Sequence, residues 1–113
     1  MAPKESEIQT AILKYLETMG YTVWRSYVGP IVQSSNRGSR VNFRPNPMAG
    51  YPDITGFLKS HPKQMFCIEV KAHNGKVSDK QKEWFELLDR HGVIVFVARS
   101  VQDVIDNLKP HEL

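Results

Sequence analysis

The sequence predicts an α/β fold in which helices flank a mixed central sheet, with the element order helix, three strands, helix, strand, helix. Apolar residues recur at helical spacing over residues 4–19 and 78–91, whereas residues 65–71 and 93–98 show the alternation or the short apolar run of a strand. A strand, a helix and a strand therefore follow one another, and such a βαβ unit predicts parallel strands with a right-handed crossover. The 113 residues suit one domain, residues 1–113.

The first helix, residues 4–19, places a carboxylate on its apolar face. That face consists of five residues at helical spacing: Ile8, Ile12, Tyr15, Leu16 and Met19. At about 100° per residue, Glu5 lies near the middle of this face and Glu7 lies far round the helix. A buried carboxylate is destabilising unless a metal or a hydrogen-bond donor compensates it. The alternative is that Glu5 lies in a frayed first turn, where acidic residues favour the helix dipole.

Residues 21–27 have the composition of a strand, and residues 28–51 have that of a long loop. Glycine, proline, serine and asparagine are frequent in the second segment and no period survives, although Val41–Arg44 is compatible with a short strand. An irregular segment of this length in a small domain usually forms a functional or mobile loop.

The same region is basic. No acidic residue lies between Glu17 and Asp53, and the stretch contains four arginines: Arg25, Arg37, Arg40 and Arg44. Such a stretch is typical of a surface for a polyanion, with DNA or RNA first, and Lys76 in a later turn is a further basic candidate. Tyr27 and Phe43 lie near these arginines and are candidates for stacking on bases. The alternative is a solvated loop whose arginines are incidental.

Two further strands, residues 53–58 and 65–71, are joined by a hairpin turn. Asp53 opens the first strand. In the second strand the apolar residues alternate with a face that carries Glu69 and Lys71, which therefore point the same way, roughly 7 Å apart along the strand. The apolar face is expected to pack on a helix. A Glu-x-Lys pair is common as a surface ion pair, but an aspartate at the start of the preceding strand favours a functional site.

The second helix, residues 78–91, begins with Ser78 and Gln81 in the arrangement of a capping box. Gln81 also lies near the centre of an apolar face with Trp84 and Leu88. A second interpretation is therefore that its amide reaches the site on the sheet.

Residues 93–98 predict a buried strand, and Ser100 predicts the cap of a final short helix. Trp24, Trp84 and Phe85 are interpreted as core residues.

The single cysteine, Cys67, excludes an intrachain disulfide and a cysteine zinc site, so a reducing cytoplasm is predicted. Its place within a strand favours a core residue over a nucleophile. The polar residues 1–7 do not predict a signal peptide, and no apolar run approaches the ~20 residues of a membrane span. The histidines lack metal-binding spacing, and the sequence contains neither a phosphate-binding glycine loop nor a G-x-S-x-G elbow.

Three carboxylates, Glu5, Asp53 and Glu69, are candidate metal ligands, with the backbone carbonyl of Val70 as a fourth. If they converge, their repulsion requires a cation, and an all-oxygen ligand set favours Mg²⁺ or Mn²⁺ over zinc. Such a site can activate a water and neutralise charge on a phosphate. Lys71 would orient the water or stabilise the developing charge.

These residues occur in four stretches, Glu5-Ser6-Glu7-Ile8-Gln9, Gly50-Tyr51-Pro52-Asp53, Ile68-Glu69-Val70-Lys71 and Ser78-Asp79-Lys80-Gln81, the last leading to Trp84. Together with the element order, they resemble the PD-(D/E)XK nuclease superfamily, and more closely its VRR-NUC (virus-type replication-repair nuclease) branch. The resemblance covers nearly the whole chain.

The resemblance implies that Asp53 and Glu69 bind the metal, that Lys71 is the catalytic lysine, and that Gln81 is the helix glutamine near the site. It also implies a ligand on the first helix, three positions before an aliphatic residue. Glu5, which precedes Ile8, fits this position, and Glu7 is the competitor. The loop at residues 28–50 is longer than in compact relatives.

Short chains of this family resemble phage and bacterial enzymes that act as homodimers on branched DNA in repair and recombination. The resemblance thus implies an endonuclease dependent on Mg²⁺ or Mn²⁺, which resolves four-way (Holliday) junctions in a bacterial or phage-infected cell. Alternatives are a nuclease on flap, single-stranded or duplex DNA, and a non-catalytic DNA-binding module of the same fold.

Overall fold

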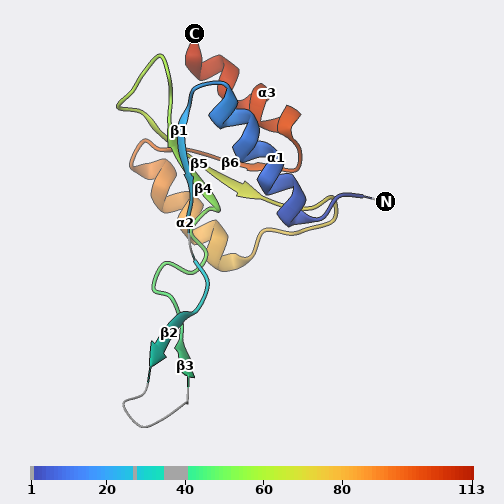
Figure 1. Cartoon of the computed structure of the whole chain (residues 1–113). Helices are drawn as coiled ribbons and strands as arrows, with labels where there is room; N and C mark the ends of the chain where they lie inside the picture. Colours follow the sequence, from blue (N-terminus) through green and yellow to red (C-terminus); the bar gives the residue numbers. More distant parts are fainter. Residues whose placement is uncertain (1, 27, 35–40) are drawn as a thin grey trace.

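The computed structural model describes residues 2–26, 28–34 and 41–113 (Figure 1). Its elements are, in order, α1 (Glu5–Thr18), β1 (Thr22–Arg25), β2 (Ile31–Ser34), β3 (Val41–Arg44), β4 (Ile54–Phe57), β5 (Met65–Val70), α2 (Asp79–Arg90), β6 (Ile94–Ala98) and α3 (Val101–Glu112). The main sheet has the strand order β1-β4-β5-β6, with β5 and β6 parallel and the other neighbours antiparallel. The predicted α/β fold with a mixed central sheet and a parallel βαβ pair is confirmed.

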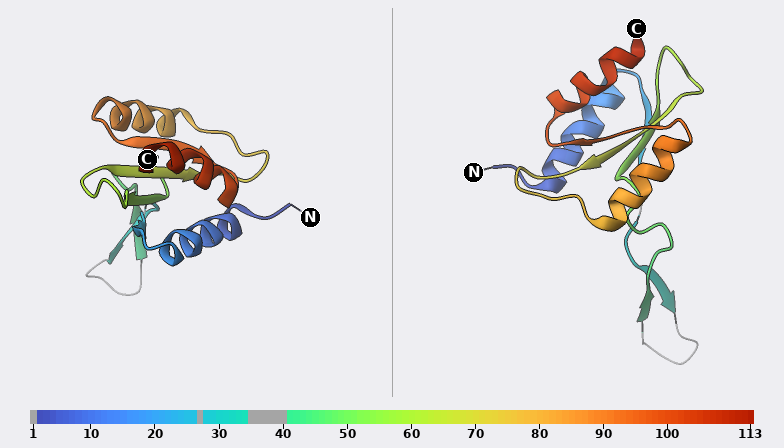
Figure 2. Two further views of the ribbon diagram at one scale, coloured as in Figure 1. Left: turned by 90° about the horizontal axis from the view of Figure 1, so that it is seen from above. Right: turned by 180° about the vertical axis from the view of Figure 1, so that it is seen from behind.

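The helices cover both faces of the main sheet (Figure 2). α1 and α3 lie on one face and contact each other, and α2 lies on the opposite face against β6. The alternation along β5 explains this arrangement, because Phe66, Ile68 and Val70 are fully buried in one core with the apolar stripe of α1. The side chains between them in sequence, including Glu69, point to the α2 face.

Residues 28–51 were expected to form an irregular loop, and in this segment the structure differs most from the prediction. They contain a second sheet of two strands, in which β2 pairs antiparallel with β3. The strand expected at Val41–Arg44 is confirmed, but the one at Ile31–Ser34 was not predicted. This hairpin, the β2–β3 arm, projects from the body of the molecule (Figure 1). The Cα radius of gyration is accordingly 15.9 Å, against about 13 Å for a compact domain of this length.

Three burial predictions were wrong. Trp24 is 44% exposed and Met19 is 46% exposed. Trp24 is on the edge strand β1, on the sheet face where α2 covers β6, and its ring contacts that of Phe57 at 5.7 Å. Met19 is the C-cap residue of α1, past the last turn that packs on the sheet. β6 was expected to be buried, yet it lies at the other edge and most of its residues are half-buried.

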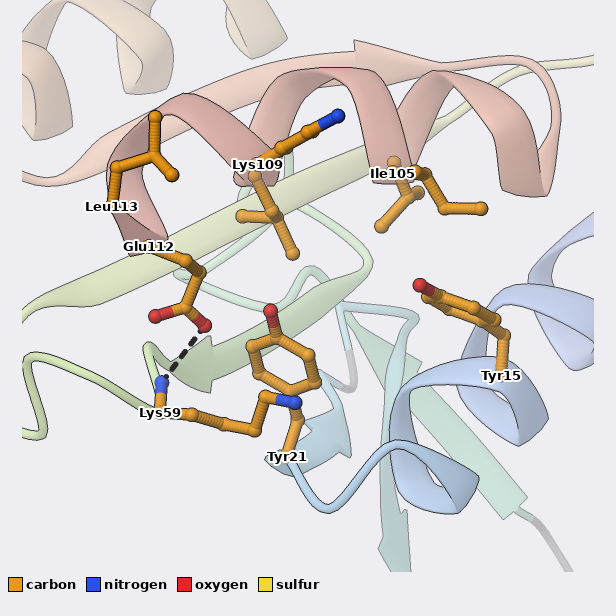
Figure 3. Close-up of a pocket in the computed structure, with 9 residues that line it drawn as sticks. Tyr15, Tyr21, Lys59, Ile105, Lys109, Glu112 and Leu113 are labelled. Carbon is orange, nitrogen blue, oxygen red and sulfur yellow. Dashed lines mark hydrogen bonds between the residues drawn. The ribbon is translucent and has the colours of Figure 1, made fainter.

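The end of α3 is tied to the turn between β4 and β5. The carboxylate of Glu112 accepts hydrogen bonds from the backbone N–H groups of Lys59, at 3.0 Å, and Ser60, at 2.9 Å. Beside this contact, α1, α3 and the start of β1 enclose a cavity of about 250 Å³ (Figure 3). The lining residue Tyr15 is ten positions from Glu5, or about 15 Å along α1, so the cavity is remote from the first turn. None of the helices in the described residues is long and apolar enough to cross a membrane.

Candidate active site

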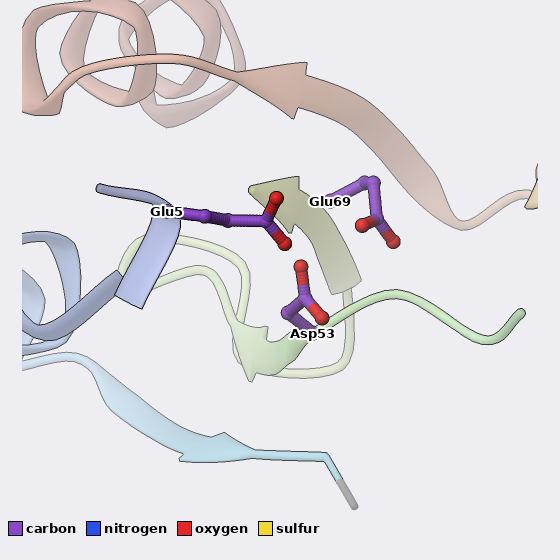
Figure 4. A group of neighbouring side chains, drawn as sticks. All are labelled: Glu5, Asp53 and Glu69. Carbon is purple, nitrogen blue, oxygen red and sulfur yellow. The ribbon is translucent and has the colours of Figure 1, made fainter. Parts of the chain in front are cut away.

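Three carboxylates from three separate elements meet at one end of the main sheet (Figure 4). Glu5 comes from the first turn of α1, Asp53 lies directly before β4, and Glu69 is in β5. Each offers one oxygen, and these oxygens all lie within 4.8 Å of one another. The strand register explains two of the three carboxylates, because Ile54 is opposite Ile68 and the next pair outward is Asp53 with Glu69. The structure thus brings together all three acidic residues that the sequence offers as metal ligands.

Glu69 is the buried member of the cluster, with 1% of its surface exposed. One carboxylate oxygen, Oε2, accepts a hydrogen bond from Gln81 Nε2 at 3.2 Å and lies 3.7 Å from Lys71 Nζ. The other oxygen, Oε1, is buried and has no partner among the described residues. Burial, then the neighbouring Asp53 carboxylate, raises the pKa of Glu69 to about 9, and the Lys71 ammonium opposes this shift. A buried acid with an unpaired oxygen and two acidic neighbours needs a cation for its ionised form.

Two hydrogen bonds fix Asp53, one to its side chain and one to its backbone carbonyl. Its Oδ2 accepts a hydrogen bond from the Val70 N–H at 2.9 Å, and its backbone carbonyl accepts one from the Ser26 N–H at 2.7 Å. For Val70 the structure therefore shows a backbone donor that orients Asp53. The Val70 carbonyl as a metal ligand stays a prediction.

Gln81 makes both of the contacts that the sequence offers as alternatives. Its Oε1 accepts a hydrogen bond from the Ser78 N–H at 2.8 Å, and its backbone N–H donates to Ser78 Oγ at 3.2 Å, which completes the capping box. The same side chain donates from Nε2 to Glu69. Because the amide has an acceptor end and a donor end, capping the helix aims the donor at the sheet.

Between the two candidate acids of α1, Glu5 is in the cluster and Glu7 is not. Both side chains are exposed. The N-cap residue Lys4 makes no side-chain capping bond, so Glu5 also lies in an uncapped first turn. Glu5 therefore fits both interpretations: it lies in the terminal turn of the helix, and it lies beside the carboxylates of the sheet.

Comparison with known proteins identifies a family for most of the chain. A family model described as the VRR-NUC domain matches residues 4–102. The chain belongs to the VRR-NUC family. One solved structure titled "VRR_NUC domain" is 25% identical and has a TM-score of 0.62, with 99% of this chain and 100% of that chain covered. Another, titled "VRR_NUC domain protein", is 21% identical with a TM-score of 0.59, covers 96% and 88% of the two chains, and supports the fold. No curated protein matches the sequence significantly.

Membership confirms the resemblance to the PD-(D/E)XK superfamily and implies a nuclease-type function with DNA as substrate. In this VRR-NUC domain, a second group of polar residues supports the acidic cluster from behind. Tyr51 Oη lies 2.9 Å from Thr55 Oγ1 and 3.3 Å from Cys67 Sγ, and its ring packs edge-on against Trp84 at 5.3 Å. Trp84 Nε1 also donates to the Ala49 carbonyl at 3.1 Å. These contacts hold the segment that leads into Asp53 against α2.

Arg99 was missed by sequence reasoning. Its Nη1 donates to the carbonyls of Ala72, at 2.7 Å, and Gly75, at 2.8 Å, so it shapes the turn that follows Lys71. The Tyr51 contacts were also not foreseen, although Tyr51 stands in the Gly-Tyr-Pro-Asp stretch. A lone arginine after a strand carries no local signal, because its partners are backbone carbonyls more than twenty residues away.

The basic candidates are distributed over two places. Arg25 is exposed at the end of β1 and precedes the Ser26 that binds Asp53, and Lys76 is exposed in the turn after Lys71. Arg44 is exposed on the β2–β3 arm. Arg37, Arg40 and the stacking candidate Tyr27 lie outside the described residues.

Proposed function

We propose that this VRR-NUC protein is an endonuclease dependent on Mg²⁺ or Mn²⁺ that cuts branched DNA, resolving four-way junctions as a homodimer. The observation that carries the proposal is the buried Glu69, whose Oε1 has no partner in the part of the chain that the structure describes, while one oxygen each of Glu5, Asp53 and Glu69 lie within 4.8 Å of one another.

The residues of this cluster fit a hard divalent cation. They offer carboxylate oxygens, which Mg²⁺ and Mn²⁺ prefer, and the cluster contains neither the thiolate nor the imidazole that zinc prefers. Glu5, Asp53 and Glu69 would hold the ion, with the Val70 carbonyl beside them. When bound, a divalent cation lowers the pKa of water and offsets charge on a phosphate.

The groups around the acids would position the substrate. The Lys71 side chain is 11% exposed, and its ammonium lies 3.7 Å from the Glu69 carboxylate, so the ammonium has further donors for a phosphate oxygen or an attacking water. Gln81 fixes the orientation of Glu69 through its amide. Arg25 and Lys76 flank this end of the sheet and are proposed to bind the DNA backbone, with Arg37, Arg40 and Arg44.

A homodimer suits a four-way junction, because two symmetric cuts require two active sites related by a twofold axis. A role in DNA repair or recombination in the cytoplasm of a bacterial or phage-infected cell belongs to the same proposal. The single cysteine, Cys67, is buried and unpaired, which suits a reducing compartment.

The test is a cleavage panel with four-way junctions, flaps, single strands and linear duplexes, in Mg²⁺, in Mn²⁺ and in EDTA. We expect the wild-type protein to cut the four-way junction with metal and not with EDTA. Asp53→Asn and Lys71→Ala should abolish cleavage and retain junction binding. Full cleavage by either variant would contradict the site, and a preference for linear duplex would contradict the substrate.

Glu5→Gln and Glu7→Gln form a matched pair for the helix ligand, because both exposed acids lie in the first turn of α1 and Glu5 is in the cluster. We expect Glu5→Gln to weaken Mn²⁺ binding and cleavage and Glu7→Gln to leave both unchanged. If neither wild-type cleavage nor metal binding is detected, the non-catalytic DNA-binding module is the better description.

A further inference from the structure

The β2–β3 arm exposes two apolar side chains that face the same way. Val32 is 59% exposed and Phe43 is 67% exposed. They are directly opposite each other in the antiparallel pair, so both project from one face of the hairpin. A two-stranded hairpin is marginal on its own in water. Phe43 is not among the described residues that pack against the core. Its exposed ring on a projecting hairpin therefore indicates a surface that another molecule covers.

The arm extends from the same end of the main sheet as the acidic cluster. β1 runs toward this end, with Arg25 opposite Ile54, and the Ser26 N–H binds the Asp53 carbonyl. Along the chain, Asp53 lies ten positions after Phe43, a reach of at most about 36 Å when fully extended. The hydrogen-bonded turns at residues 46–49 and 48–51 shorten this reach. One turn of duplex DNA spans about 34 Å. Phe43 is thus within one helical turn of a phosphate bound at the cluster.

The positive charge of the arm indicates which kind of molecule covers it. No acidic residue lies between Glu17 and Asp53, so the arm and its root carry only positive charges. Arg44 follows Phe43 in β3 and is exposed on the opposite face by strand alternation, and Arg25 is exposed at the root. A second copy of the arm would repel this surface, whereas a nucleic acid complements it with phosphates for the arginines and bases for the ring.

We propose that the β2–β3 arm recognises the branch point of DNA, with Phe43 stacked on a base that has lost its neighbour and Arg44 on an adjacent phosphate. This inference rests on the proposed function and names the feature of the substrate that the nuclease reads. In a continuous duplex every base is stacked on both sides, so inserting a ring requires unstacking. At a branch point the strands pass from one arm to another, so the stack there opens at less cost than inside a continuous duplex. Phe43 is therefore a specificity-determining residue for branched over linear DNA.

The experiment measures binding in the Asp53→Asn background, so that the DNA stays intact. We compare Phe43 with Phe43→Ala and Phe43→Trp on a four-way junction and on a linear duplex of the same sequence. Phe43→Ala should weaken junction binding about tenfold, within the range for the loss of one base–aromatic stack, and duplex binding less than about threefold. Phe43→Trp should retain the preference for the junction. Met19→Ala, another exposed apolar residue far from the arm, is the matched control and should change neither affinity.

A second readout places the ring at the branch. A 2-aminopurine at the branch point should brighten when the wild-type ring is present and stay dark with Phe43→Ala at saturating protein. Equal losses on junction and duplex, or an unchanged 2-aminopurine signal, would overturn the inference. So would a change from dimer to monomer with Phe43→Ala in sedimentation, because the arm would then bind a second copy. Failure of the proposed function itself appears separately, as absence of metal-dependent cleavage by the protein with Asp53 intact.

Discussion

Gln81 makes two side-chain contacts that substitutions can separate, because its Oε1 caps α2 and its Nε2 donates a hydrogen bond to Glu69. Ser78→Ala removes the half of the capping box that Ser78 Oγ accepts and leaves both contacts of the Gln81 amide. Gln81→Ala removes both contacts. Gln81→Glu retains an acceptor for the capping box and replaces the donor that faces Glu69 with a carboxylate. The three variants therefore isolate the contribution of the contact at the site.

The expected magnitudes follow from these contacts. Loss of a cap costs about 1 kcal/mol, and a hydrogen bond to the neutral acid that burial favours contributes about another 1 kcal/mol. For 113 residues, 1 kcal/mol corresponds to about 4 °C in Tm. Without metal we expect Tm to fall by about 4 °C in Ser78→Ala and by about 8 °C in Gln81→Ala. Gln81→Glu should be destabilised increasingly as pH rises, because a second carboxylate then faces the ionising Glu69.

The assay is thermal unfolding at several pH values, with and without Mn²⁺. Mn²⁺ should raise the Tm of Gln81→Glu more than that of the wild type, because the cation neutralises the added charge, and should raise the Tm of Ser78→Ala by the wild-type amount. The reasoning would be refuted if Gln81→Ala were no less stable than Ser78→Ala. It would also fail if Mn²⁺ gave Gln81→Glu no extra stabilisation.

Three further outcomes are expected from the ionisable groups. Since burial raises the pKa of Glu69 to about 9, cation binding must displace a proton, and calorimetry should show apparent Mn²⁺ affinity rising about tenfold per pH unit between about pH 6.5 and 8.5. Because the pKa of Glu69 is higher in the folded state, the stability of the metal-free protein falls as pH rises from 4.5 toward 9. Glu69→Gln should therefore stabilise the metal-free protein by about 3 kcal/mol at pH 7 in denaturant titrations. The same variant should lack this pH dependence of stability and should not cleave DNA. Burial raises the pKa of Glu112, but hydrogen bonds from Ser60, Tyr21 and the turn backbone lower it to about 2. Stability from this group is present above 4.5 and lost toward pH 2, and acid titration of Glu112→Gln should lack that loss.

The main sheet and the acidic cluster were accessible to sequence reasoning because local patterns encode them. Apolar spacing at Ile8, Ile12 and Leu16 defined the buried face of α1, and Glu5 stood out as the acid on that face. Alternation in β5 likewise separated Glu69 from its apolar neighbours. In each case one side of the element is buried, so the sequence must alternate with the period of the element.

The errors occur where no core imposes a period. The β2–β3 arm has exposed residues on both faces, such as Phe43 and Arg44, so no alternation marks its strands, and β2 was missed. Trp24 was interpreted as a core residue, but its exposure follows from the position of β1 at the sheet edge. Strand order depends on contacts between distant segments, which a single sequence does not record.

The three acids differ in how firmly the fold holds them, and this difference bears on metal binding. Asp53 and Glu69 are anchored by the sheet, through the Val70 N–H and through Gln81. Glu5 is exposed in a first turn whose N-cap residue provides no side-chain bond. Helix ends open at much lower free energy than a buried sheet. The sheet therefore presents a rigid pair of carboxylates whose charge a cation would offset, and the first turn of α1 presents a third carboxylate that would close on such a cation.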